Sequence, residues 1–228
     1  MRGRDRETRE RLIEAAARLF AERGFSKVTV RDICRSAGAN VAAVNYHFGG
    51  KTGLYREIVW AAIRTMQTTT DAIRRAGDRR PPEEQLAAFI KIFLARVVES
   101  RDSRIHQLML RELSDPTPAL DLVARHVVHP RLAYLRRVVT ALLGRRASEA
   151  TVEHCVMSVQ SQCLALLNGK VATRLQPRVI TGRRLDALAE HITTFSLAGI
   201  RGVTSEGKRG RLRRSTPHDR RGRLLRRL

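Results

Sequence analysis

Asn45 is the residue of this chain best suited to reading a nucleic-acid sequence. Its side-chain amide carries a donor and an acceptor, the pair that matches the edge of adenine in the major groove of DNA. The same amide could equally donate to a phosphate, which positions a protein without reading a base. At helical spacing, Val41, Ala42 and Tyr46 fall on the same outward face as Asn45. The chemistry available on this face is recognition.

Two short helices are needed to present this face. Residues 29–32 (Thr-Val-Arg-Asp) have the form of a capping box, which predicts the start of a helix that Gly38 would end. Asn40 can cap a second helix, which Gly49 and Gly50 would end. Such a pair works as a helix-turn-helix when its second helix projects into a major groove about 12 Å wide. The residues expected to pack inward are Ile33, Ala37, Val44 and Phe48.

The stretch from Thr29 to Tyr55 (TVRDICRSAGANVAAVNYHFGGKTGLY) closely resembles the signature of the TetR family of regulators. It follows a second family-like segment, LIEAAARLFAERGF, from Leu12 to Phe25. The resemblance implies an N-terminal DNA-binding domain, followed by a helical body that dimerises and encloses a ligand pocket.

The resemblance also implies roles for single side chains. Thr29 is similar to a phosphate contact, and Arg31 to a side chain that reaches a phosphate or a base edge. Tyr46 and His47 resemble a pair that presses on the DNA backbone, although His47 could instead be a packed core histidine. Lys51 is similar to a phosphate anchor, helped by the free N–H groups of the helix that it opens. The residues expected to bind DNA are Thr29, Arg31, Asn40, Val41, Ala42, Asn45, Tyr46, His47 and Lys51.

The charge of the chain favours a polyanionic partner. Lysine and arginine total 44 against 22 acidic residues, which gives a net charge of +22. Such an excess attracts nucleic acid or an anionic surface, whatever the fold. The three cysteines form no CxxC pair, and no stretch approaches the roughly 20 apolar residues that cross a bilayer. We therefore expect a soluble cytoplasmic protein without a membrane partner.

Catalysis is not expected. The sequence offers no nucleophile and base at an informative spacing, no cluster of metal ligands and no phosphate loop. We therefore predict no enzymatic activity, no cofactor and no metal. The alternative is a helical enzyme, and turnover of any compound in a panel of small molecules would support it.

The spacing of apolar residues predicts an all-α chain of about nine helices. Residues 1–50 are expected to form a three-helix helix-turn-helix domain that continues into a linking helix over residues 51–75, and the arginines before its first helix to form a frayed end or a minor-groove arm. Residues 76–200 are expected to form the bundle for ligand binding and dimerisation, with a kink at Pro130. Residues 201–228 are arginine-rich and nearly free of apolar side chains, which predicts a disordered basic tail.

The bundle carries two expectations about function. The motif RELSDPTPA, Arg111–Ala119, together with AAVNYHF, resembles a CecR-like subgroup of TetR regulators. A ligand pocket is expected between the linking helix and the helices after it, although each candidate could be ordinary core. The candidates for its lining are Met66, Phe89, Phe93, Met109, Val127, Tyr134 and Gln160.

The last two predicted helices carry apolar residues spaced alternately three and four apart, which is typical of a helix-pairing seam. The seam could join two copies in a four-helix bundle, or join two core helices of one protomer. In the first case the homodimer interface is formed by Val152, Val156, Val159, Cys163, Leu166, Leu185, Leu188, Ile192 and Phe195.

These features predict a ligand-responsive transcriptional repressor. It would be a homodimer that leaves a pseudo-palindromic site on double-stranded DNA when a small-molecule effector binds. The alternative is a sequence-indifferent protein that binds nucleic acid or an anionic surface through its charge excess. The two differ because only the first has a preferred duplex.

Overall fold

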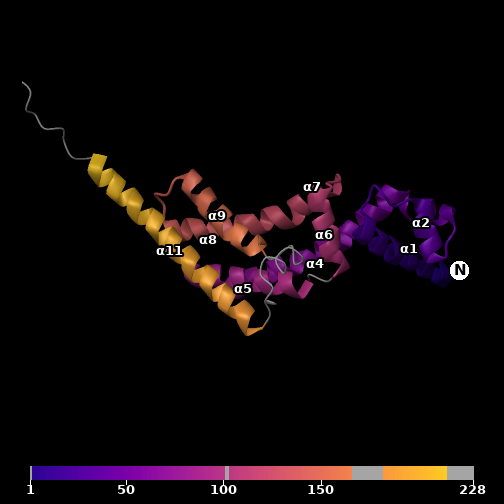
Figure 1. The fold of residues 1–228 in the computed structure, drawn as a ribbon, viewed down its shortest axis with the longest axis horizontal. Helices are drawn as coiled ribbons and strands as arrows, with labels where there is room; N and C mark the ends of the chain where they lie inside the picture. Colours follow the sequence, from indigo (N-terminus) through magenta and orange to yellow (C-terminus); the bar gives the residue numbers. More distant parts are fainter. Residues whose placement is uncertain (1, 101–102, 166–181, 215–228) are drawn as a thin grey trace, which may run out of the picture.

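The computed structural model describes residues 2–100, 103–165 and 182–214, and every regular element within them is helical. The predicted all-α class is confirmed. With α7, η1 and α8 counted as one continuous helix, the described ranges hold nine helices. The molecule is elongated, with α1 to α3 at one end and α11 at the other (Figure 1).

The N-terminal unit consists of α1 (Arg2–Arg23), α2 (Val30–Ala37) and α3 (Val41–Phe48). The capping box of α2 is present, since Asp32 N donates to Thr29 Oγ1 and Thr29 N donates to the Asp32 carboxylate, both at 3.1 Å. Asn40 caps α3, because its Oδ1 accepts from Ala42 N at 2.9 Å. Hydrogen bonds between neighbouring residues therefore define where both helices of the helix-turn-helix begin.

Helix α1 begins earlier than the sequence suggests. The arginines at its start belong to the helix, which corrects the expectation of a frayed end or a free arm. The reason is packing against the rest of the unit: Arg9 lies over the ring of Phe48 at 5.3 Å and forms an ion pair with Glu57.

One long helix connects the two ends of the molecule. α4 (Lys51–Gly77) has 27 residues, which at 1.5 Å per residue makes it about 40 Å long. Its first half packs on the N-terminal unit, and its second half packs on α5 (Pro82–Ser100). The two ends of the molecule therefore share one helix.

The kink expected at Pro130 takes the form of a π-helical turn. α7 (Ala119–Val123) runs through the π-helix η1 (Ala124–Val128) into α8 (His129–Leu143) without a break. Proline has no N–H, so the carbonyl of His126 loses its usual helical donor. Gln67 Nε2 of α4 donates to that carbonyl at 3.3 Å instead.

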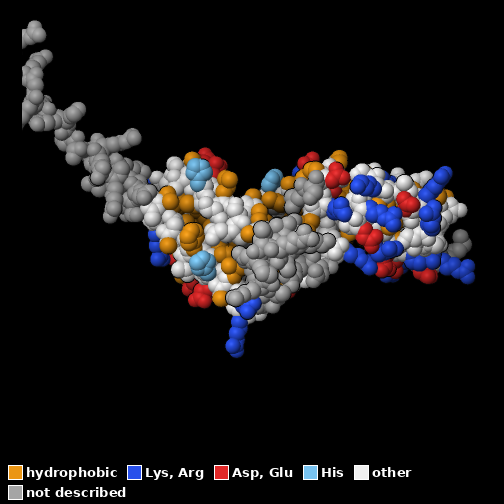
Figure 2. Space-filling view, in the orientation of Figure 1, with side chains coloured by type: hydrophobic (Ala, Val, Ile, Leu, Met, Phe, Trp, Pro, Cys, Tyr) orange, Lys and Arg blue, Asp and Glu red, His pale blue; other side chains and the backbone are white. Residues whose placement is uncertain are grey.

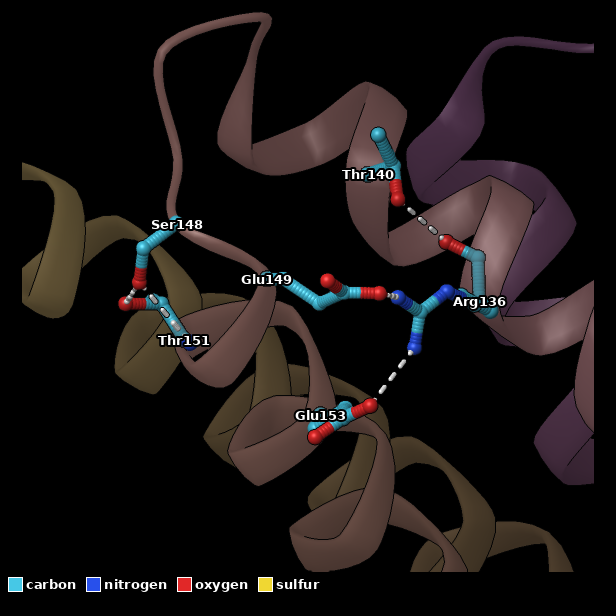
Figure 3. A network of polar contacts seen from close by, with 6 residues as sticks. All are labelled: Arg136, Thr140, Ser148, Glu149, Thr151 and Glu153. Carbon is cyan, nitrogen blue, oxygen red and sulfur yellow. Dashed lines mark hydrogen bonds and ion pairs between the residues drawn. The ribbon is translucent and has the colours of Figure 1, made fainter.

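A polar network fixes α9 (Glu149–Leu164) against α8. Arg136 donates to Glu149 at 2.7 Å and to Glu153 at 3.3 Å, while Ser148 caps α9 at Thr151 (Figure 3). One guanidinium therefore holds the first two turns of α9.

The last described helix, α11 (Arg183–Arg214), continues past residue 200. Residues 201–214, which the sequence assigns to the basic tail, are therefore helical. A helix that is anchored by buried residues such as Ile200 gains one backbone hydrogen bond for each residue that it adds. Composition gives no information about this gain. Residues 215–228 lie outside the described ranges.

Two hydrophobic cores hold the fold. The first lies in the body and joins α5, α8, α9 and α11. The second holds the N-terminal unit together and extends over the first half of α4 to α6 (Arg104–Ser114), α7 and η1, through Leu108, Ala119, Val123 and Val127. The N-terminal core thus includes part of the body. No helix in the described ranges is long and apolar enough to cross a bilayer.

Candidate nucleic-acid interface

Helix α3 exposes the face that the sequence predicts. Val44 is fully buried beneath it, whereas Ala42, Asn45 and Val41 are exposed and Tyr46 is 78% exposed. The side chains of this face are available to a partner outside the protein.

Thr29 and Asn40 already have partners within the protein. The Thr29 hydroxyl donates to the Asp32 carboxylate at 2.6 Å, and its backbone N–H donates to the same group. These bonds from Thr29 lower the pKa of Asp32 below its usual value. Thr29 therefore stabilises the start of α2, and Arg31, two residues later, is exposed.

His47 takes the alternative role left open by the sequence, that of a packed histidine. Its side chain is only 8% exposed, and its Nε2 lies 3.5 Å from an oxygen of Asp5. Its ring stands between those of Tyr46 and Phe48, with centroids 4.9 and 5.8 Å away. The His47 side chain is therefore packed within the protein, whereas Tyr46 is exposed.

Lys51 is engaged inside the N-terminal unit. Its ammonium group donates to the carbonyls of Phe25 and Val28, both at 3.0 Å, and lies 4.2 Å from the ring centroid of Phe25. It therefore ties the start of α4 to the segment between α1 and α2. A phosphate contact from Lys51 would have to use the one donor that these bonds leave.

Basic side chains gather at the end of the molecule formed by α1 to α3 (Figure 2). The exposed basic residues of this end include Arg4, Arg6, Arg11, Lys27, Arg31 and Arg35. A positive surface beside an exposed helix provides a phosphate-binding rim around a reading face.

The residues predicted to line a ligand pocket do not lie together in the structure. Phe89, Phe93 and Tyr134 stack in the body core, whereas Val127, Met66 and Met109 belong to the N-terminal core, and Gln160 lies on α9. Helical spacing could not tell these two cores apart. The structure instead has an open cavity of about 420 Å³, where the end of α4 and the start of α5 meet α8. Tyr134 is the one predicted residue that lines it.

The predicted dimer seam mostly faces its own protomer. Five of its residues are buried in the body core, while Leu185 and Leu188 pack against that core and Leu166 lies outside the described ranges. The three-four spacing therefore pairs α9 and α11 with neighbours in the same chain. The buried residues are Val152, Val156, Val159, Cys163 and Ile192.

Phe195, the remaining residue of the predicted seam, is 63% exposed. Other apolar side chains of α9 and α11 are also exposed: Met157 is 62% exposed, and Leu164 and Val203 are exposed as well. Figure 2 shows hydrophobic side chains and histidines on the lobe that contains these helices. Exposed apolar surface of this kind marks an interaction site.

The sequence did not reveal a polar bridge between the body and the N-terminal unit. The Glu112 carboxylate is buried and accepts from the hydroxyls of Tyr55 and Thr117. Burial and the bond to Glu112 raise the pKa of Tyr55 above its usual value. The RELSDPTPA motif contains Glu112 and Thr117, but nothing in it showed what they touch.

The same segment also contacts the N-terminal unit from outside. Arg111 donates to the carbonyl of Glu22 at 2.6 Å, and Ser26 donates to Asp115 at 3.0 Å. Glu112 and these two bonds form the α6 bridge, which couples α6 and its following turn to α1 and α4.

The chain matches two protein families along its length. Residues 12–58 match the family described as "Bacterial regulatory proteins, tetR family", and residues 82–200 match the family described as "HTH-type transcriptional dual regulator CecR, C-terminal domain". The CecR regulator of Shigella flexneri is 25% identical over 173 residues, which cover 72% of this chain and 77% of that protein. The regulator TtgR of Pseudomonas putida is 31% identical over 107 residues, which are 45% of this chain. The matched part spans about half of TtgR, at 49%.

Solved structures of similar fold cover most of the chain. A putative transcriptional regulator from Pseudomonas aeruginosa PAO1 aligns with a TM-score of 0.61 and 25% identity, covering 84% of this chain and 90% of that one. The TetR family regulator PfmR from Thermus thermophilus aligns with a TM-score of 0.58 at 21% identity, over 82% of this chain and 97% of that one. This second likeness shows the fold alone.

An all-helical chain that exposes the second helix of a helix-turn-helix belongs to the class of helix-turn-helix proteins. Within that class, the two family matches together extend over most of the chain. The chain is a member of the TetR family of bacterial regulators, with a C-terminal domain of the CecR type.

Proposed function

We propose that this protein is a cytoplasmic, ligand-responsive repressor that binds a pseudo-palindromic DNA site as a homodimer. The single observation that carries the proposal is the exposure of Asn45 and Tyr46 on α3, above a buried Val44. A helix presented in this way enters the major groove, while arginines around it neutralise phosphates.

Dimerisation would place two copies of α3 on one side of the DNA. The exposed apolar side chains of α9 and α11 form the surface proposed for the partner copy, and Phe195 and Met157 are its most exposed members. Two copies of α3 about one DNA turn apart, roughly 34–36 Å, would read half-sites related by the two-fold axis. The same interface would fix the spacing of the half-sites.

Ligand response would travel through α4. The cavity lies at the C-terminal end of α4, and the helix-turn-helix lies at its N-terminal end. The α6 bridge holds the N-terminal unit against the body, so the unit moves with α4 and α6 together. A ligand that binds more tightly to another spacing shifts the population away from DNA, and by linkage DNA weakens the ligand equally.

Selection of bound duplexes from a random pool tests the DNA-binding part of the proposal. We expect the full chain to enrich a pseudo-palindrome, and Asn45→Ala to relax the preference at one position of each half-site. Loss of a bidentate contact to adenine should reduce discrimination there by about 1–3 kcal/mol. Arg31→Ala is the matched comparison, since an exposed phosphate contact should weaken all duplexes alike and reduce the salt dependence.

Equal enrichment of all duplexes by the unaltered protein would contradict the proposal and favour a charge-driven, sequence-indifferent binder. A variant that ends at Arg214 separates the two possibilities further, because it keeps α11 complete and removes basic residues. The repressor should keep its preferred duplex in this variant.

A further inference from the structure

The open cavity at the C-terminal end of α4 is lined mainly by polar and basic side chains. Its charged lining consists of three arginines, Arg74 of α4, Arg79 of the turn that follows and Arg137 of α8, and of one acid, Asp78. Three guanidinium groups against one carboxylate give the lining a net charge of +2. A volume of about 420 Å³ lies within the range of small-molecule sites in proteins.

Two of these arginines have no acidic partner among the described residues. The Arg74 side chain forms neither a hydrogen bond nor an ion pair with any of them. Arg137 donates to the side-chain oxygen of Gln85 at 3.3 Å, and its guanidinium lies 5.0 Å from the ring centroid of Tyr134. These two contacts hold Arg137 beside the cavity and leave its charge uncompensated. A guanidinium in this state suits the planar, two-bonded capture of an anion.

The hydroxyl of Tyr134 adds a donor at the wall of the cavity. The residue is only 6% exposed, and its hydroxyl has no hydrogen-bond partner among the described residues. A Cβ on Gly77 would stand 2.1 Å from this oxygen, and Gly77 and Tyr134 both line the cavity. Buried hydroxyls in native proteins nearly always have a partner, and an acceptor on a bound ligand would supply the missing one.

Two other buried polar atoms of the described residues lack a partner, Thr70 Oγ1 and Arg131 Nε, and neither residue lines the cavity. The Arg131 side chain has a structural role, because another of its nitrogens donates to the Met66 carbonyl at 3.4 Å and ties α8 to α4. Of the three unpartnered groups, the Tyr134 hydroxyl is therefore the one that belongs to the cavity.

The turn between α4 and α5 holds Arg79 in an unfavourable backbone conformation. Among the described residues, Arg79 is the only one other than glycine with a positive φ, at 56°. The left-handed region is unfavourable for any residue with a Cβ. The ion pair of Arg79 with the exposed Asp78, at 3.9 Å, is too weak to offset this. Residues held in such conformations concentrate at ligand sites.

We infer that this cavity binds the phosphate group of a small phosphate monoester. At neutral pH such a group carries close to two negative charges and three acceptor oxygens. It therefore matches both the net charge of the lining and the donors that Arg74, Arg137 and Tyr134 bring from two helices. The ester is the effector, so the inference rests on the proposed function and gives its ligand a chemical class. A merely solvated patch of arginines would explain the charge but neither the Tyr134 hydroxyl nor the conformation of Arg79.

Calorimetric titration of the full chain tests the chemical class. The probes are phenyl phosphate and phenyl sulfate, which have nearly the same shape but differ by one negative charge. Salt at about 0.15 M screens unspecific attraction to a chain of net charge +22. We expect the phosphate ester to bind at least tenfold more tightly than the sulfate ester. Absent or equal binding of the two esters, or binding of succinate as tight as that of phenyl phosphate, overturns the inference.

Matched variants locate the site. Arg74→Met should reduce the affinity for phenyl phosphate at least tenfold. Arg75→Met should leave it unchanged, because Arg75 is an exposed neighbour on α4 that does not line the cavity. Tyr134→Phe removes only the unpartnered hydroxyl and should weaken the ester several-fold with an unchanged thermal transition. Equal losses in Arg74→Met and Arg75→Met overturn the inference.

Titration of phenyl phosphate against the selected duplex separates this inference from the proposed function. We expect the ester to lower DNA affinity by fivefold or more, and Arg74→Met to abolish this effect. Tight binding of the ester with unchanged DNA affinity overturns its role as effector, while selective DNA binding leaves the proposed function standing. A protein without any preferred duplex overturns the proposed function itself.

Discussion

At the scale of single residues, several polar side chains near the DNA-facing surface are committed to the protein itself. Thr29 and Asn40 cap helices, and Lys51 holds two backbone carbonyls. Exposure rather than residue type therefore decides which side chains can reach DNA. Asn45 and Tyr46 remain outward, which leaves base reading to a small set of groups.

Lys51 provides a test at this scale. Lys51→Met should lower the free energy of unfolding by about 1–3 kcal/mol, because the carbonyls of Phe25 and Val28 lose a charged donor. Urea unfolding followed by circular dichroism measures this change.

Lys27→Met is the control for that experiment, since Lys27 is exposed and the substitution removes the same charge. If Lys51→Met is as stable as the unaltered protein but binds all duplexes more weakly, then Lys51 acts as a phosphate anchor and not as a structural tie.

At the scale of elements, the α6 bridge and α4 connect the helical body to the helix-turn-helix. The Glu112 carboxylate joins α6 to α4 through Tyr55 and to the following turn through Thr117. The second hydrophobic core passes through the same elements. The N-terminal unit is therefore packed against the body through both apolar and polar contacts.

A double-mutant cycle measures the strength of this connection. Tyr55→Phe and Glu112→Gln should each lower the free energy of unfolding, because each leaves a buried polar group without its partner. Together they should cost less than the sum, with a coupling energy of about 1 kcal/mol or more, since they break one shared contact.

Tyr46→Phe is the matched control, because that hydroxyl is exposed on α3. Strict additivity of the Tyr55 and Glu112 substitutions in urea unfolding would show that the bridge carries no energy.

At the scale of the whole molecule, the proposed DNA-reading helices and the proposed dimer surface lie at opposite ends of an elongated body (Figure 1). The exposed apolar residues of α9 and α11 lie far from the basic end, which leaves both surfaces free to act together. This arrangement suits a dimer that places two reading helices on one DNA segment.

Phe195 tests this arrangement. Phe195→Glu should convert the dimer to monomers and lower the apparent DNA affinity at least tenfold, because a charge would enter the apolar contact and each monomer would hold only one half-site. Light scattering after size-exclusion chromatography measures the mass.

Ala61→Glu, on the exposed side of α4, is the control, and it should stay dimeric. A Phe195→Glu protein that remains a dimer with full DNA affinity would rule out this face as the interface.

The sequence by itself determined the features that depend on neighbouring residues. The Thr29 capping box, the Asn40 cap, the glycine stops and the outward face around Asn45 are all local, because a helix end is set within about four residues and a helix face repeats every 3.6. The family resemblance rested on the same local segment and was also correct.

Only the tertiary structure decided which elements meet. Helical spacing marked Val159 and Cys163 as a pairing seam, but it could not tell whether the partner helix came from the same chain or another. It marked Met66 and Phe93 as possible pocket residues, although they lie in different cores. The roles of Lys51, Glu112 and Arg131 depend on groups 23 to 65 positions away in the chain, and periodicity carries no information about contacts at that distance.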